Sequence, residues 1–170
     1  MEALRLVLLA VLPALVIVAG LMDLTTMKIP NWISGLLILA FFPAALVVGL
    51  GPQEMGIHLG VGLAALLVGM GLFALNLLGG GDVKLMAAAC LWLGLSVSGL
   101  FILATAVIGG LFSLALLMGR AWLQPWAGAG PGWFAQLMEP KGHIPYGVAI
   151  AGGALLAWPA SPLMTAFLGA

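Results

Sequence analysis

Long apolar runs, separated by a handful of charges, are the feature that most constrains how this chain can fold. Only 6% of its 170 residues are charged and 64% are hydrophobic, whereas roughly a quarter of the residues are charged in an average soluble domain. A helix needs about 20 apolar residues to cross a bilayer, and several runs reach that length. The sequence therefore predicts an all-α, polytopic membrane protein whose outer surface contacts membrane lipid.

Charges, glycines and prolines divide the chain into six predicted membrane-spanning helices. They lie near residues 4–22, 32–50, 57–78, 83–98, 99–119 and 144–168. The division between the fourth and the fifth depends on a tight turn within LGLSVSGL, and without that turn the number falls to five. The first run is long enough to span, so we expect a retained helix rather than a cleaved signal. We expect a six-helix bundle that forms one membrane-embedded domain over residues 1–170.

Basic residues predict the orientation, because short loops rich in Lys and Arg stay in the cytoplasm. Arg5 lies alone on one side of the predicted bundle. The loops on the other side carry Lys28, Lys84, Arg120 and Lys141. We therefore expect the N-terminus to face outward. Glu54 and His58 then fall in a short outer loop, where solvated side chains are expected.

Composition also limits the kind of partner and site. Five basic residues balance five acidic ones, so no basic surface is present for nucleic acid. Cys90 is the only cysteine, which excludes an internal disulfide and a four-cysteine zinc site; we expect it to be a small buried hydrophobic residue. The sequence predicts no metal and no cofactor, and it does not predict the oligomeric state.

Two further patterns concern packing. Residues 120–143 combine tryptophans with prolines and glycines, a composition typical of a segment in the headgroup region. Small residues recur at a spacing of four, which permits close helix packing in lipid. These pairs are Gly56 with Gly60, Ala65 with Gly69, and Ala149 with Gly153.

Two aspartates interrupt the apolar pattern. Asp23 follows the first predicted helix in GLMDLTTMKIPNW, and Asp82 precedes the fourth in LNLLGGGDVKLMAA. Ionisable groups near membrane depth are costly and usually functional. The chain crosses the membrane twice between them, so both carboxylates emerge on the same face in either orientation. A simpler interpretation is that the glycines end one helix and Asp82 caps the next.

A facing pair of carboxylates is suited to peptide hydrolysis. Two such groups cannot both ionise easily, so they share one proton and supply a base and an acid together. The base deprotonates a water molecule, and the acid polarises the peptide carbonyl that the water attacks. Asp82 lies at the positive end of its helix dipole and Asp23 at the negative end of its own. We therefore hypothesise that Asp82 is the resting base and Asp23 the resting acid.

Two other classes of function remain open on these residues. A small proton-coupled transporter or channel subunit would use the two aspartates as a proton relay. An assembly or scaffold protein of a secretion machine would need neither carboxylate. Acids in a transport path often lie on broken helices at mid-membrane, whereas Asp23 and Asp82 both lie near helix ends on one side. This placement favours the hydrolase.

The segments GGGDVKL, DLTTMKIPNW and KGHIPYGVAIAGG together resemble the type IV prepilin peptidases, which are membrane aspartic proteases of the GxGD class. The length and six-helix plan are similar to the short branch that serves tight-adherence, Flp-type pili. The resemblance implies that Asp23 and Asp82 are the catalytic aspartates. It also implies supporting roles for Gly79, Gly81, Lys84, Pro145 and Gly147. Lys28 is a further candidate for orienting substrate, with a topology anchor as the alternative.

The resemblance implies a substrate and a location. The expected reaction removes a short basic leader from a prepilin or pseudopilin precursor, after a glycine, at the cytoplasmic face of the bacterial cytoplasmic membrane. The mature hydrophobic helix then stays in the membrane. Longer members of the family carry a four-cysteine zinc domain and methylate the new N-terminus. The single cysteine here implies neither a metal nor methyltransferase activity.

Overall fold

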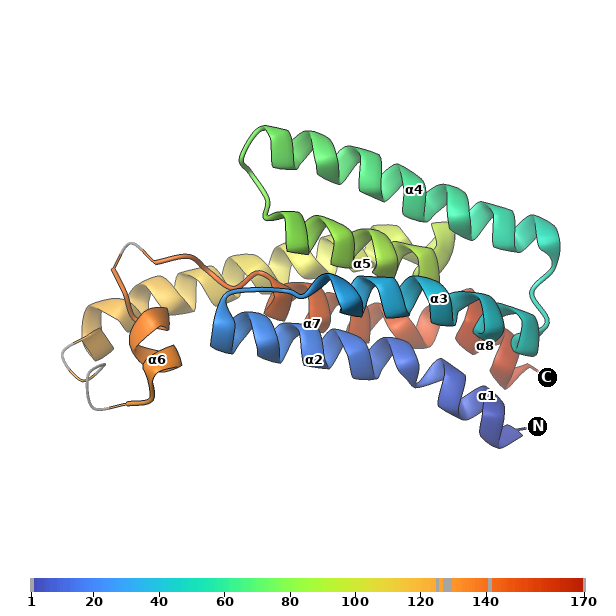
Figure 1. Ribbon diagram of the computed structural model, residues 1–170, viewed down its shortest axis with the longest axis horizontal. Coiled ribbons are helices and arrows are strands. Elements are labelled where there is room, and N and C mark those ends of the chain that lie inside the picture. Colours follow the sequence, from blue (N-terminus) through green and yellow to red (C-terminus); the bar gives the residue numbers. More distant parts are fainter. Residues whose placement is uncertain (1, 125, 127–129, 141, 170) are drawn as a thin grey trace.

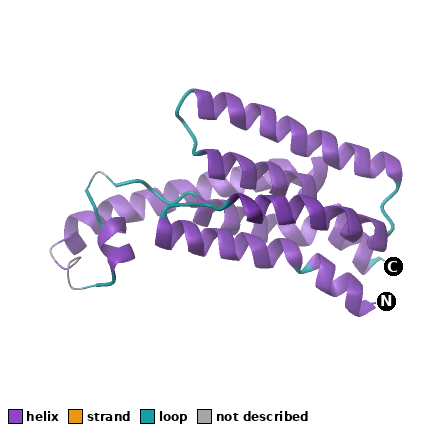
Figure 2. Ribbon diagram, in the orientation of Figure 1, coloured by secondary structure: helices purple, strands orange, loops and turns teal. Residues whose placement is uncertain are grey.

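The computed structural model describes residues 2–124, 126, 130–140 and 142–169 (Figure 1). Within these ranges the chain forms helices and no strand (Figure 2), which confirms the all-α prediction. The elements are α1 (Glu2–Leu9), α2 (Val11–Thr26), α3 (Asn31–Val48), α4 (Pro52–Ala74), α5 (Gly80–Leu123), α6 (Gly132–Leu137), α7 (Gly147–Ala157), a 3₁₀ turn η2 (Trp158–Ala160) and α8 (Pro162–Leu168).

Five stretches of the described chain are long and apolar enough to span a membrane. They are Glu2–Thr26, Asn31–Val48, Pro52–Ala74, Gly80–Leu123 and Gly147–Leu168. The fourth and fifth predicted helices form a single element, α5, but the chain reverses direction inside it (Figure 1). The predicted turn is therefore present. It lies at Gly94 rather than between residues 98 and 99.

The reversal at Gly94 needs a glycine. Its φ of 69° and ψ of 179° belong to a region of backbone conformation that is essentially restricted to glycine. A Cβ at this position would also lie 2.7 Å from Cε1 of His58, closer than van der Waals contact allows. The first half of α5 thus runs away from the Gly80 end, and the second half runs back beside it (Figure 1).

His58 fills the inside of this reversal, so the prediction that it is a solvated loop residue is wrong. The side chain is only 3% exposed. Its Nδ1 donates to the carbonyl oxygen of Leu91 at 2.7 Å, and its ring stacks on Phe41 with centroids 5.5 Å apart. The cause is that α4 begins at Pro52 and not near residue 57, which places His58 within the helix and against α5.

Glu54 lies in the first turn of α4 and remains exposed. Its Oε2 accepts a hydrogen bond from the backbone N–H of Gly51 at 2.9 Å. A carboxylate at this end of a helix is favoured by the helix dipole. Glu54 is thus a surface residue, as expected, and it also helps to start α4.

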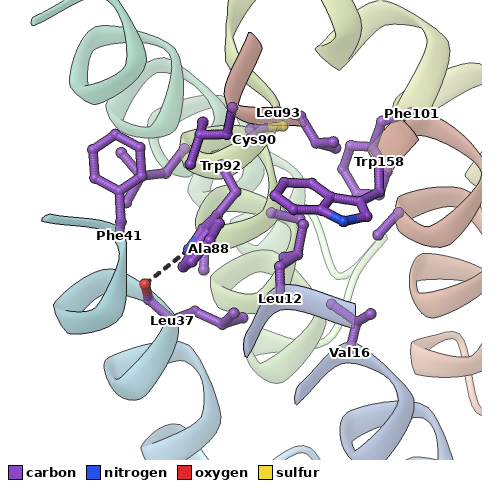
Figure 3. Close-up of a cluster of buried hydrophobic side chains, with 14 of the residues drawn as sticks. Leu12, Val16, Leu37, Phe41, Ala88, Cys90, Trp92, Leu93, Phe101 and Trp158 are labelled. Carbon is purple, nitrogen blue, oxygen red and sulfur yellow. Dashed lines mark hydrogen bonds between the residues drawn. The ribbon is translucent and has the colours of Figure 1, made fainter. Parts of the chain in front are cut away.

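Trp92 lies at the centre of the main core (Figure 3). Its indole Nε1 donates to the carbonyl oxygen of Leu37 in α3 at 2.8 Å. Its ring packs edge-on against Phe41 and Trp158, with centroids 6.1 and 5.9 Å away. Buried aromatic pairs stabilise by about 0.5–1.5 kcal/mol beyond their burial of area. The first half of α5 is thereby tied to α3 and to the C-terminal helices.

Small residues allow α7 to pack tightly against its neighbours α2 and α5. A Cβ at Gly20 of α2 would lie 3.1 Å from Cβ of Ala151, and one at Gly153 of α7 would lie 2.8 Å from the backbone nitrogen of Thr105. The expected role of small residues holds at Gly153. It is wrong for Gly56 and Gly60, since a Cβ at either would meet no atom within 4 Å.

The expected headgroup segment is only partly described. Trp122 and Trp126 are 80% and 71% exposed, and α6 lies within this segment. Residues 125, 127–129 and 141 lie outside the described residues, and so does the expected role of Lys141.

The reversal yields a stability prediction. Gly94→Ala is expected to lower the free energy of unfolding by about 1–3 kcal/mol, because it forces a non-glycine residue into a strained backbone conformation. Gly99→Ala is the matched control, since its Cβ would meet nothing within 4 Å, and it is expected to change stability by less than about 1 kcal/mol. Unfolding in mixed detergent micelles, followed by circular dichroism, measures both. Equal stabilities would contradict the assignment of Gly94.

Candidate active site

Asp23 lies in the last turn of α2, because that helix continues to Thr26 instead of ending near residue 22. The helix stops where Met27 adopts a left-handed conformation with φ 55° and donates its N–H to the carbonyl oxygen of Asp23 at 2.8 Å. The side chain is 6% exposed. Its Oδ2 accepts the backbone N–H of Gly147 at 2.7 Å. Asp23 therefore touches the first residue of α7, which is 124 positions away in the sequence.

Asp82 lies in the first turn of α5, three residues after the N-cap Gly79. Its carboxylate lies against Gly79. The N-cap residue is Gly79 and not Asp82, so the simpler interpretation is wrong on this point. A Cβ on Gly79 would lie 2.7 Å from Oδ2 of Asp82, so only glycine allows this contact without displacing the carboxylate.

Gly81 allows the connection between α2 and α3 to approach the start of α5. A Cβ on Gly81 would lie 3.1 Å from Cβ of Ile29 and 3.4 Å from its carbonyl oxygen. Ile29 comes six residues after Asp23 in the sequence. The glycine therefore brings the segment that follows Asp23 close to the helix that carries Asp82.

The two carboxyl groups line the same two cavities. One cavity, of about 500 Å³, lies between residues 27–31 and residues 79–81. The other, of about 580 Å³, lies between residues 76–79 and residues 143–146. The structure thus brings together the two acids that the even number of crossings leads one to expect at the same face.

Helix dipoles do not distinguish the two carboxylates as the sequence alone suggests. Asp82 lies in the first turn of α5, and Asp23 accepts the N–H of the first residue of α7. Both therefore lie against the positive end of a helix. The hypothesis that Asp82 is the base and Asp23 the acid rests on the dipoles of α2 and α5 alone. The dipole of α7 also acts on Asp23.

The remaining predicted residues differ in whether they line a cavity with the two aspartates. Lys28 lines the first cavity, and the buried Pro145 lines the second. Gly147 contacts Asp23 directly. Lys84 lines neither aspartate cavity; its Nζ instead donates to Oδ1 of Asn31 at 2.9 Å. Lys84 therefore joins the start of α5 to the start of α3.

Arg120 is the residue near the site that sequence reasoning missed, because it was read only as a charge that sets the orientation. It lies in the last turn of α5 and is only 6% exposed. Its Nε donates to the carbonyl oxygen of Leu137 at 2.9 Å, and its Nη2 donates to the carbonyl oxygen of His143 at 3.0 Å. These bonds hold both ends of the segment that leads into Gly147. The sequence feature that could have identified Arg120 is its position as a lone arginine between an apolar run and a Gly/Pro-rich loop.

The sequence profile of the type IV leader peptidase family matches residues 10–114, which is more than half of the chain. The chain belongs to this family. The resemblance to prepilin peptidases is confirmed at that level, and with five apolar spans the protein is a multi-pass membrane protein and a member of a peptidase family. No significant match was found among curated proteins or among solved structures.

The matched range contains Asp23, Asp82, Lys28 and Lys84 but stops before Gly147. The family match therefore does not include α7, whose first residue, Gly147, contacts Asp23 in the structure. Among the residues that the structure describes, no three His, Cys, Asp or Glu side chains gather into a group that could hold a metal ion.

The anchoring role of Arg120 can be tested by hydrogen exchange. Arg120→Met keeps an unbranched apolar stem and removes the donors, so the backbone N–H groups of residues 142–144, 146 and 147 are expected to exchange at least about tenfold faster. Met118→Leu is the control, because Met118 lies on the same helix turn and is exposed. The hydrogen-exchange rates of the two variants should differ only in the segment from residue 142 to residue 147. Equal exchange there would contradict the anchoring role.

Proposed function

We propose that this leader peptidase is an aspartic endopeptidase that removes the leader from type IV prepilin or pseudopilin precursors, with those of Flp-type pili as the expected substrates. One observation carries the proposal. Asp23 and Asp82, which lie on helices separated by two membrane crossings, line the same two cavities in a member of the type IV leader peptidase family.

The proposed mechanism uses one water molecule held between the two carboxyl groups. The ionised carboxylate takes a proton from the water while the protonated partner donates a hydrogen bond to the scissile carbonyl oxygen. The resulting hydroxide adds to the carbonyl carbon and gives a tetrahedral intermediate. The proton taken from water then passes to the leaving nitrogen, and the C–N bond breaks. The backbone N–H of Gly147 would hold the carboxyl group of Asp23 in place throughout.

The proposed cytoplasmic placement of the site rests on the distribution of basic residues. Lys28 lines a cavity with both aspartates, and Lys84 lies two residues after Asp82. Arg120, at the end of α5, also lies at this end of the bundle, as Figure 1 shows for the end of that helix. Basic residues of short loops favour the cytoplasmic side.

Removal of either titrating proton is expected to abolish catalysis. Asp23→Asn and Asp82→Asn keep the shape of the side chain, and each should lower kcat by about 10²–10⁴-fold, the usual contribution of a general acid or base. The assay follows leader removal from a purified Flp-type precursor by mass spectrometry. Glu54→Gln is the control, because it changes an exposed carboxylate at the opposite end of the bundle, and it should leave kcat unchanged.

The same assay separates the competing functions. An Asn variant that cleaves the precursor as fast as Glu54→Gln would remove the basis for an aspartate mechanism. If the wild-type chain cleaves no precursor but carries protons across liposomes in a manner that needs Asp23 and Asp82, the transporter would replace the peptidase.

Gly147 is expected to affect catalysis through the position of Asp23. A Cβ at residue 147 would lie 2.8 Å from Cβ of Asp23 and 2.9 Å from its Oδ2. Gly147→Ala must therefore displace the carboxylate, and a displacement of this size can cost about 10²-fold in rate. Gly110→Ala is the control, since its Cβ would meet nothing within 4 Å. Equal kcat values for folded preparations of both variants would show that this contact is irrelevant to the reaction.

A further inference from the structure

We propose that the open groove between α3 and α4 receives the membrane-spanning helix of the precursor and thereby presents its N-terminal end to the aspartates. The α3–α4 groove is a cavity of about 700 Å³ lined by residues of 31–38 in α3, 59–70 in α4 and 84–91 in α5. The inference rests on the proposed peptidase function and names the surface that binds the substrate.

The groove exists because α3 and α4 hardly touch, although they follow one another in the chain. Helix α4 packs extensively on α5, and α3 packs on α5, α1 and α2, whereas α3 and α4 do not form a packed pair. Figure 1 shows α4 standing apart from α3 along most of its length. The exposed apolar side chains on both walls include Ile38 and Leu63, which are 44% and 58% exposed.

One end of the groove coincides with the candidate active site. Asn31 lines both the groove and the cavity that contains Asp23 and Asp82. Its side chain accepts a hydrogen bond from Lys84, which lines the groove as well. From residue 31 to residue 38, α3 rises about 10 Å, or two helical turns. A helix seated in this space would therefore end directly beside the two carboxyl groups.

Two features favour a helix over a lipid chain as the occupant. Ser34 lines the groove, is only 4% exposed, and has no hydrogen-bond partner for its Oγ among the described residues. An acyl chain offers such a hydroxyl nothing, whereas a helix can offer a carbonyl or a polar side chain. Gly35 also lines the space, and a Cβ there would meet no atom within 4 Å, so the backbone of a docked helix can approach α3 closely at this point.

The apolar cavity on the other face of α4 provides an internal comparison. It measures about 340 Å³ and is lined by Val68, Cys90 and Ser98 among others. Its hydroxyl is already satisfied, since Oγ of Ser98 donates to the carbonyl oxygen of Gly94 at 2.7 Å. It contains neither Asn31 nor a charged residue. Because the hydroxyl in this second cavity already has a hydrogen-bond partner, the cavity suits a lipid chain better than a substrate helix.

The first test fills the groove with a large side chain. Gly35 and Gly60 are both helical glycines whose Cβ would meet no atom within 4 Å, but only Gly35 lines the groove. Gly35→Phe is expected to lower kcat/KM for a complete precursor at least about tenfold, mainly through KM, and Gly60→Phe to change it less than about twofold. If the wild type cleaves the precursor and both variants match it, the docking proposal fails while the peptidase stands. If the wild type cleaves nothing, the proposed function itself fails.

The second test does not depend on how well Gly35→Phe folds. A photoreactive amino acid replaces Leu63, in the groove, or Val68, in the comparison cavity; the two side chains are similarly exposed, at 58% and 66%. In membranes containing the complete chain and the precursor, position 63 is expected to crosslink to the hydrophobic segment of the precursor, and position 68 only to lipid. Crosslinks to lipid alone at position 63, or stronger precursor crosslinks at position 68, would overturn the proposal.

Discussion

The structure depends on the fact that two antiparallel membrane crossings, α3 and α4, separate Asp23 from Asp82. An even number of crossings returns the chain to the face it left, so the end of α2 and the start of α5 must lie at the same end of the bundle (Figure 1). Hydrocarbon cannot satisfy a carboxylate, and this constraint keeps both acids at helix ends. Topology therefore brings the two acids to the same end of the bundle, and side-chain contacts only adjust their positions there.

Contacts with two glycines then hold the two acids in place. Gly147 donates its N–H to Asp23, and Gly79 lies against Asp82. A side chain at either glycine would collide with the adjacent carboxylate. Arg120 fixes the segment that leads to Gly147 through two carbonyl oxygens. A buried charge that lacks such partners would be costly. Asp23 and Arg120 are thus both paired with backbone groups.

The sequence predicted those features that depend on hydrophobic length and on the number of crossings. The helical class, the spans and the common face of Asp23 and Asp82 follow from these alone. The reversal inside α5 was predicted only to within a few residues, since several small and polar residues of that segment could form a turn, and the conformation at Gly94 decides among them. The prediction for His58 was wrong because the start of α4 lies five residues earlier than predicted, and a single sequence also does not reveal which side of α4 faces α5.

Long-range contacts could not be predicted for a related reason. The hydrogen bond between Gly147 and Asp23 joins residues 124 positions apart, and no local pattern encodes it. That contact brings the positive end of α7 to Asp23, which opposes the negative end of α2 that the sequence alone suggested. The gap between α3 and α4 is likewise a tertiary property. Helices adjacent in the chain are expected to be neighbours in space, but here α5 is the packing partner of both.

The shared position of the two carboxyl groups is the central claim, and thiol crosslinking in native membranes tests it most directly. In a Cys90→Ala background, the double substitution Asp23→Cys with Asp82→Cys places thiols at both positions, while Asp23→Cys with Glu54→Cys places them at opposite ends of the bundle. A short bifunctional thiol reagent is predicted to link the first pair rapidly within one chain and to leave the second pair unlinked. Failure to link residues 23 and 82 under conditions in which both thiols react singly would contradict the account.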